Sequence, residues 1–425
     1  MTLTLPAKTL TDLPPELLLL VASSLESNDL KSLSLTSRTT TRAAQQAFLK
    51  SLVVDGDKIY SFIGTPFDSK DPRGRLAALE DRGKIGLVRH LELRCITSRC
   101  MTAICKAERD GGYVYDFPSE DVFEGGDAIP MDNIIELIAR LSNLREAEIA
   151  FPRTVPSQDQ LDRIRPVLEN LTILRLVIGK WDRQHSFLQS LLPYLGKLRT
   201  LDLRMVDCPI YKAGANPRWI LDRPFLPKLT HLILRSPYYL SFDRYALFST
   251  DLIPQITNLS IDFPTDAVND DAYEGVSEEE VSPKALMELF GPTIQHLSLT
   301  YPLWRAVGML EEQNIDISRC FAKSLAPLTT LQSLTIDSFA YTGEFLIKLP
   351  QSCRLIVVRN DFRFQRYSFR EIFRKIGSEI GSTLRGRTLR LKSHSGDSSD
   401  FVQSWRICQQ LGLNVEFVRM RKEFS

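Results

Sequence analysis

The stretch LENLTILRL, residues 168–176, decides the fold that this sequence predicts. Its aliphatic residues follow the form Φ-x-x-Φ-x-x-Φ-x-Φ, where Φ is usually leucine or isoleucine. The closing alternation Leu174-x-Leu176 is typical of a short strand that turns one face inward. Between one such stretch and the next, the aliphatic spacing changes to that of a helix. The predicted unit is therefore a strand followed by a helix.

The same form repeats along nearly the whole chain beyond residue 84. Full copies occupy residues 85–93, 141–149, 168–176, 195–203, 226–234, 253–261 and 328–336. The copies at 291–299 and 349–357 each lose one aliphatic residue, and frayed copies lie at 387–391 and 413–417. The step between copies is roughly 27 residues in the middle of the chain, within or just above the range of leucine-rich repeats.

The repeated pattern resembles a leucine-rich-repeat solenoid. The resemblance implies an α/β fold, an irregular solenoid in which a curved parallel sheet carries helices on its convex side. Regular repeats place Asn or Cys three residues beyond the second strand leucine. This sequence has other residues there, namely Gly179, Val206, Pro237, Pro264, Pro302 and Phe339. We therefore expect turns that lack the usual side-chain ladder.

Residues 13–42, LPPELLLLVASSLESNDLKSLSLTSRTTTR, predict a compact set of short helices before the repeats. Asp12 is a possible N-cap, and the two prolines suit the first turn of a helix. The first helix is apolar on most sides, which exceeds what so small a module needs for its own core. The leucine-rich stretch therefore predicts a surface that docks onto a partner, although an ordinary helical cap on the repeats is the simpler alternative.

The same residues resemble an F-box, most closely the form common in fungal F-box proteins. The resemblance is carried by Leu13-Pro14-x-Glu16-Leu17, Asp29-Leu30-x-x-Leu33-x-Leu35 and Thr36-Ser37-Arg38. It implies that the module binds the Skp-type adaptor of an SCF-type cullin-RING E3 ubiquitin ligase, and that the rest of the chain selects a target protein. By position, the adaptor contacts would be Leu13, Pro14, Leu17, Leu20, Leu30, Leu33 and Leu35.

The expected organisation has three parts. The F-box would occupy residues 9–54, a linker 55–84 and the repeat domain 85–425. Inserts at 108–130 and 266–281 interrupt the repeat period and should be loops, which either form solvated surface or help to grip a partner.

The target-binding face is expected on strand residues that lie between and beside the inward leucines. The principal candidates are Arg204, Ile233, Arg235, Asp262, Thr300 and Asp337. Further candidates are Arg175, Asp202, Ser260, Ser298, Thr335, Ile356 and Arg390, with His231 and His296 beside them. Mixed charge with isolated apolar positions suits a protein surface and lacks the continuous basic track that nucleic acid requires.

Composition narrows the possible ligands and the possible location of the protein further. Lys plus Arg, 53, nearly cancels Asp plus Glu, 52, so no overall field draws the chain to nucleic acid or an anionic membrane. No apolar run approaches the roughly 20 residues that span a bilayer. Seven cysteines without paired spacing favour a reducing compartment, the cytosol or nucleus.

Chemistry-bearing motifs are not recognisable in the sequence. Cys95, Cys100 and Cys105 recur near His90, but their five-residue steps favour structural thiols over a zinc site. We therefore expect no metal, no cofactor and no enzymatic activity. Two alternatives stay open: a repeat scaffold that binds the Skp adaptor but acts outside ubiquitination, and a hydrolase whose catalytic residues are scattered along the sequence.

Overall fold

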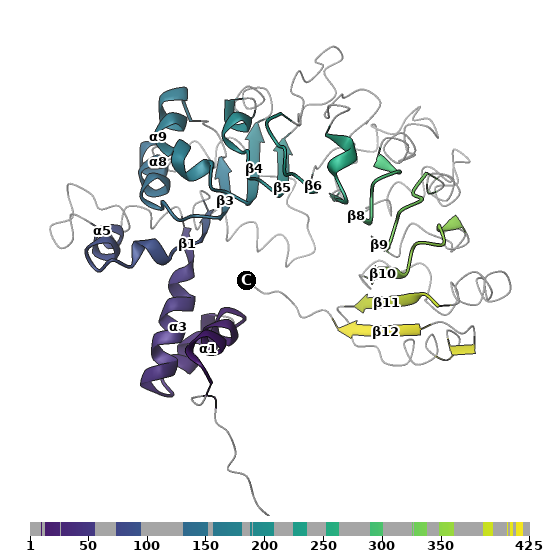
Figure 1. Ribbon diagram of the computed structural model, residues 1–425, viewed down its shortest axis with the longest axis horizontal. Helices are drawn as coiled ribbons and strands as arrows, with labels where there is room; N and C mark the ends of the chain where they lie inside the picture. The colour runs from purple at the N-terminus through teal and green to yellow at the C-terminus, as the bar shows by residue number, and fades with distance from the viewer. Residues whose placement is uncertain are drawn as a thin grey trace, which may run out of the picture. The chain divides into compact units, whose positions relative to one another are not determined.

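The computed structural model of the 425-residue chain describes the folded elements shown in Figure 1. The described residues are 10, 13–25, 27–55, 74–94, 131–151, 156–180, 188, 190–207, 224–235, 252–262, 290–300, 325, 327–337, 348–360, 386–393, 406, 409–410 and 414–419. Asp12, the cysteines at 95, 100 and 105, and the two inserts predicted as loops lie outside them.

Three helices form an N-terminal helical module: α1, Pro15–Ser23; α2, Ser27–Ser34; and α3, Arg38–Lys50. Helix α1 begins with proline at its first position, where the missing N–H is no loss. Helix α3 begins with a capping box. The backbone N–H of Thr40 donates to Ser37 Oγ at 3.2 Å, and that of Ser37 donates to Thr40 Oγ1 at 2.9 Å. The three predicted helices are confirmed.

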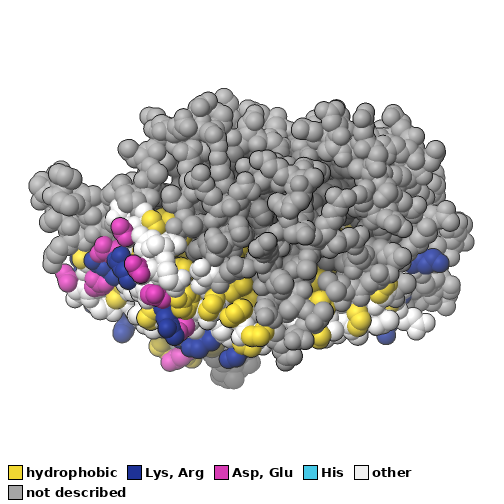
Figure 2. Space-filling model, turned by 90° about the horizontal axis from the view of Figure 1, so that it is seen from above, with side chains coloured by type: hydrophobic (Ala, Val, Ile, Leu, Met, Phe, Trp, Pro, Cys, Tyr) yellow, Lys and Arg dark blue, Asp and Glu magenta, His cyan; other side chains and the backbone are white. Residues whose placement is uncertain are grey.

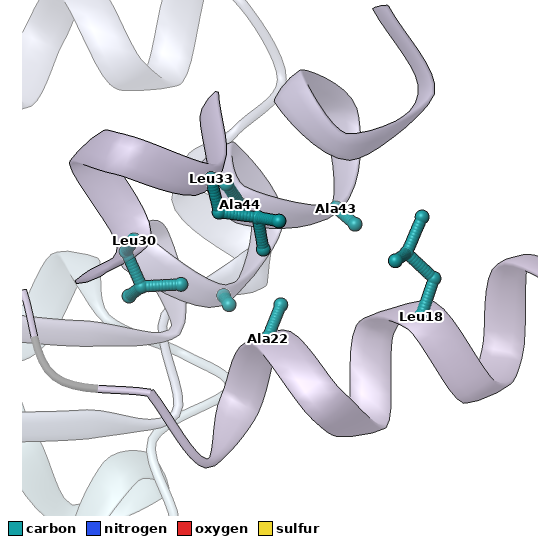
Figure 3. Close-up of a cluster of buried hydrophobic side chains, with 7 residues drawn as sticks. Leu18, Ala22, Leu30, Leu33, Ala43 and Ala44 are labelled. Atoms are coloured by element: carbon teal, nitrogen blue, oxygen red, sulfur yellow. The ribbon is translucent and has the colours of Figure 1, made fainter. Parts of the chain in front are cut away.

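Small side chains let these helices pack closely. The module's core consists of Leu18, Ala22, Leu30, Leu33, Ala43, Ala44 and Ala47. In Figure 3, Leu18 and Ala22 on one helix point toward Leu30, Leu33, Ala43 and Ala44. The residues that α3 buries recur at helical spacing, so they form one narrow stripe along it.

Beyond the helices, twelve strands of the described chain form one sheet in which each strand neighbours the next in sequence. They are β1 Ser51–Asp55, β2 His90–Arg94, β3 Glu146–Phe151, β4 Ile173–Lys180, β5 Thr200–Asp207, β6 His231–Arg235, β7 Asn258–Asp262, β8 His296–Thr300, β9 Ser333–Asp337, β10 Leu355–Asn360, β11 Thr388–Ser393 and β12 Asn414–Arg419. The sheet is parallel, and its order is that of leucine-rich repeats. This confirms the predicted α/β fold.

The inward leucines of neighbouring strands meet in register. Leu201 is paired with Leu232, Leu232 with Leu259, and Leu259 with Leu297. All four side chains are buried. Burial of one such side chain stabilises a fold by about 1.5–3 kcal/mol, so the repeated rows supply the continuous core that single repeats lack.

Strand β1 has no counterpart among the predicted repeat copies. It is paired with β2 so that Leu52 lies opposite Leu91 and Val54 opposite Leu93. Helix α5, Gly74–Asp81, lies within the segment predicted as a linker. Strand β1, the first strand of the sheet, follows α3 directly, because α3 ends at Lys50 and β1 begins at Ser51.

Helices precede several strands, as the repeat pattern predicts. Helix α8, Met131–Arg140, precedes β3, and helix α9, Gln158–Leu168, precedes β4. The two helices lie side by side (Figure 1), and Gln160 Nε2 donates to Asp132 Oδ1 at 2.9 Å between them. Other strands follow single 3-10 turns: η3 Ile85–Leu87, η4 Leu192–Tyr194 and η5 Ile253–Gln255.

Strand β10 corrects one predicted register. The copy at 349–357 placed Leu355 and Val357 inward and Ile356 on the outer face. The structure pairs Ile356 with Leu334 and Val358 with Ile336, which are both core residues. Ile356 is therefore buried, and its assignment to the target-binding face is wrong. The inward pattern of this repeat is shifted by one residue.

Side chains on the turns before the strands join neighbouring repeats. Each donates to a backbone carbonyl of the preceding repeat. The bonds run from Asn143 to Gly86, from Gln255 to Leu226, from Thr330 to Ile294, from Ser352 to Thr329 and from Arg387 to Leu349. Neighbouring repeats are thus joined by polar contacts as well as by aliphatic packing, and several residue types share the task.

The chain divides into two compact units, with the boundary inside β4 between Leu174 and Arg175. The helical module and β1–β3 belong to the first unit. Strands β5–β12 belong to the second.

Candidate functional site

Helix α1 exposes large apolar side chains on the side away from the module's core. Leu17 is 49% exposed and Leu20 is 68% exposed, whereas Leu18 and Ala22 are fully buried. Pro14, also exposed, precedes Leu17 by three residues, as Leu17 precedes Leu20. This spacing places the three residues along one face of the helix.

Leu35, which follows α2, is 87% exposed. Hydrogen bonds hold the turn that carries it: Thr36 Oγ1 donates to the carbonyl of Leu33 at 2.9 Å, and Thr41 Oγ1 donates to that of Ser34 at 2.5 Å. The turn is therefore anchored at both ends to the helices that it joins. The backbone that carries Leu35 is therefore held in place before any partner arrives, so binding there loses little backbone entropy.

The seven residues predicted as adaptor contacts fall into two groups. Pro14, Leu17, Leu20 and Leu35 are exposed, and we call them the exposed apolar set. Leu30 and Leu33 are buried in the module's core, and Leu13 packs against that core. Leu13, Leu30 and Leu33 therefore hold together the helices on which the exposed apolar set lies.

Sequence reasoning assigned no role to two further exposed residues of this region. Phe48 in the last turn of α3 is 49% exposed, and Val53 at the centre of β1 is exposed as well. Phe48 directly follows Ala47, the last core residue of α3. The helical spacing of the buried residues of α3 could have revealed it, because the residue next to Ala47 lies about 100° away around the helix.

On the sheet, one row of register-paired residues crosses β5–β12 between the inward leucines, and we call it the middle row. It contains Asp202, Ile233, Ser260, Ser298, Thr335, Val357, Arg390 and Glu416. Its central members, from Ile233 to Val357, carry no charge. At one end Asp202 Oδ2 lies 3.9 Å from Arg175 Nε. At the other, Arg390 Nε donates to Glu416 Oε2 at 2.7 Å.

The predicted target-binding residues share the strands of this part of the sheet. Arg204 is paired with Arg235, Arg235 with Asp262, and Asp262 with Thr300, so these four form a second row. Asp337 lies in β9 and is paired with Arg359 of β10. Ile233 is a partly exposed member of the middle row. The backbone thus brings Arg204, Arg235, Asp262 and Thr300 into one line across four strands.

His231 and His296 occupy equivalent positions at the starts of β6 and β8, with Asn258 of β7 between them. Burial lowers the pKa of His231, and a charged His296 would lower it further. His231 Nδ1 lies 2.8 Å from Thr230 Oγ1, and His296 Nδ1 lies 2.7 Å from Ser333 Oγ. Within the described residues, no three His, Cys, Asp or Glu side chains gather as potential metal ligands.

Cys353 has the environment of a structural thiol. Its side chain is fully buried, and burial raises its pKa to about 11. At neutral pH the thiol is therefore protonated, which is the unreactive form. Arg387 lies close enough to favour the thiolate slightly, but its Nη2 donates to the carbonyls of Leu349 and Pro350.

The charged side chains visible in Figure 2 include both signs, which are interspersed toward the left of that view. Among the helices that the structure describes, none is long and apolar enough to cross a membrane. No protein-family model matches the chain, and no curated protein matches it either.

Proposed function

We propose that this chain is the substrate-recognition adaptor of an SCF-type cullin-RING E3 ubiquitin ligase. The helical module acts as an F-box that binds a Skp-type adaptor and, through it, a cullin. The repeat domain binds a target protein. Ubiquitin transfer is carried out by other subunits, so on this proposal the chain is not an enzyme, needs no cofactor and works in the cytosol or nucleus.

The observation that carries the proposal is the contrast between neighbouring residues of α1. Leu18 and Ala22 complete the module's core, while Leu17 and Leu20 stay exposed. Burial of a leucine stabilises by about 1.5–3 kcal/mol, so a partner that covers these side chains gains several such contributions. Clustered apolar exposure of this kind is typical of a protein-binding surface.

The join between α3 and β1 supports the second half of the proposal. The helix passes into the strand without an intervening residue, and the backbone N–H of Arg89 donates to the carbonyl of Lys50 at 2.9 Å. A partner bound to the helices is thus held in a set position relative to β1–β3. A ligase that acts by proximity gains from such a join, because a fixed arrangement raises the local concentration of the target near the subunits that transfer ubiquitin.

The decisive experiment is co-purification of the full chain with a Skp-type adaptor and a cullin. We expect the double variant Leu17→Ser, Leu20→Ser to lose adaptor affinity by about a hundredfold, since two apolar anchors are removed. The matched control is Leu87→Ser, Val418→Ser, which changes two exposed apolar residues outside the helical module. The control should bind as the wild type does.

Two results would contradict the proposal in different ways. If the wild-type chain binds no Skp-type adaptor, or the α1 variant binds as well as the control, the helical module is not an F-box. If the adaptor binds but no cullin is recovered with it, the chain is a repeat scaffold that acts outside ubiquitination.

A further inference from the structure

Two histidines stand at equivalent positions of the sheet with one strand between them. His231 at the start of β6 is paired with Asn258 of β7, and Asn258 is paired with His296 of β8. Residues paired in this way across a parallel sheet lie on the same face, so the three side chains form one short row. Both histidine side chains are exposed. The row is therefore open to a ligand.

The spacing of the row suits a single metal ion. Adjacent strands lie about 4.8 Å apart, so the backbones of His231 and His296 lie about 10 Å apart. An imidazole ring from each side can reach an ion between them at the roughly 2.0–2.1 Å that zinc–nitrogen bonds take. The two rings also lie close enough for a charge on His296 to lower the pKa of His231. Asn258 lies between them and can supply a side-chain oxygen.

Hydrogen bonds hold both rings by the same nitrogen. His231 Nδ1 lies 2.8 Å from Thr230 Oγ1, and His296 Nδ1 lies 2.7 Å from Ser333 Oγ. These contacts occupy Nδ1 and leave Nε2 as the nitrogen that can face a ligand. Histidines that bind metal ions are typically held through their other nitrogen in this way, which fixes the orientation of the ring.

The chemistry of the row and its neighbours selects the class of ion. The adjacent middle-row residues Ile233, Ser260 and Ser298 carry no charge. Imidazole nitrogens without a carboxylate favour Zn²⁺, Cu²⁺ or Ni²⁺ over Mg²⁺ and Ca²⁺, which prefer oxygen ligands. Partial burial lowers the pKa of His231, so its ring is neutral at neutral pH, the form that binds a metal ion.

We propose that His231 and His296 bind one divalent transition-metal ion of the zinc class, with Asn258 beside it. Zinc in proteins commonly takes four ligands, so the remaining positions go to water or to a side chain of a protein bound to this face. The ion links β6 to β8 across β7 and adds positive charge beside the uncharged centre of the middle row. The inference does not depend on the proposed function, because it concerns the repeat sheet alone.

The test is calorimetric titration of the metal-free, reduced full chain with Zn²⁺ and, separately, with Mg²⁺. We expect one Zn²⁺ to bind in a way that depends on both histidines, and Mg²⁺ not to bind there. His231→Ala and His296→Ala should each lower the affinity of that site at least about tenfold, because loss of a ligand costs no less than loss of the group that orients it. Zinc should also raise the melting temperature of the wild type through this site.

The matched control is His90→Ala. His90 has the equivalent position in β2, but the residues paired with it are Ser51 of β1 and Glu146 of β3, so no second histidine lies in the neighbouring strands. This variant should bind Zn²⁺ as the wild type does.

A second pair of variants keeps both histidines and so guards against misfolding. Thr230→Val and Ser333→Ala each remove the hydroxyl that holds one ring. Each should lower the zinc affinity by about tenfold, because the ring is then free to turn away from the ion.

Three results would overturn the inference. The histidine variants could bind as many Zn²⁺ ions as tightly as the wild type, which would place any bound zinc elsewhere in the chain. His90→Ala could lose as much affinity as His231→Ala does. Mg²⁺ could bind the row as tightly as Zn²⁺, which would assign the ion to oxygen ligands. Adaptor binding is measured separately: if the chain binds no adaptor but binds zinc through the two histidines, the proposed function fails and this inference stands.

Discussion

The side-chain amide of Gln255 donates to the backbone carbonyl of Leu226, 2.6 Å away, and so joins one repeat to the repeat before it. The same Nε2 donates to the carbonyl of Leu229 at 2.8 Å. One side chain thus satisfies two carbonyls of the turn that precedes β6. Polar side chains before the strands have a structural role in this solenoid.

The first prediction concerns this contact. Gln255→Ala should lower the free energy of unfolding by about 1–3 kcal/mol, because two carbonyls lose their donor. The measurement is urea unfolding followed by circular dichroism. Gln351→Ala, at an exposed position in the turn before β10, is the matched control and should change stability by less than about 0.5 kcal/mol. Equal effects of the two substitutions would show that Gln255 does not join the repeats.

The second prediction concerns the capping box of α3. Ser37→Ala removes the acceptor for the backbone N–H of Thr40 and should lower stability by about 0.5–2 kcal/mol. Ser37→Asp keeps an acceptor at the helix start and should restore most of the loss. Thermal unfolding of the full chain measures both. Thr39→Ala, an exposed residue in the first turn, is the control, and a loss as large as that of Ser37→Ala would argue against the cap.

The third prediction tests the corrected register of β10. Ile356 is 1% exposed, so Ile356→Ala should lower stability by about 2–5 kcal/mol through the lost packing and the cavity left behind. Ile233→Ala, in the partly exposed middle row, should lower it by less than about 1 kcal/mol. Denaturant unfolding of both variants measures the two losses of stability. The reverse order of effects would restore the register in which Ile356 faces outward.

The residues of β10 show why its register could not be predicted from the sequence. The strand begins Leu355-Ile356-Val357-Val358, an unbroken aliphatic run, and such a run contains no alternation that marks the inner face. The other repeat strands alternate between leucine or isoleucine and polar residues over most of their length, so their inward positions were predictable. The strand itself was predicted in the right place, but its inward face was not.

Strand β1 was not predicted as part of the repeat sheet, for a different reason. Leu52 and Val54 alternate as in the other repeats, but the positions three and six residues before Leu52 lie in α3, and Gln46 breaks the aliphatic pattern there. In the helical module, the sequence showed an excess of leucine but not which leucines the core would use. Leu30 and Leu33 became core and Leu17 and Leu20 became surface because packing of three helices, rather than any one helix, selects the inner side.

The fourth prediction follows from the buried thiol of Cys353. Burial raises its folded-state pKa from 9.0 to about 11, so the native state keeps its proton where the unfolded state has lost it. Stability from this group is therefore complete below pH ~9 and is lost as the pH rises toward ~11, by about 1–3 kcal/mol in total. Tyrosines and lysines titrate in the same range, so the contribution of Cys353 is the difference between the wild type and Cys353→Ala. Unfolding free energies of both proteins, measured between neutral pH and about pH 11, should converge as the pH rises. A difference that stays constant across this range would mean that Cys353 contributes through packing alone and that its proton plays no part.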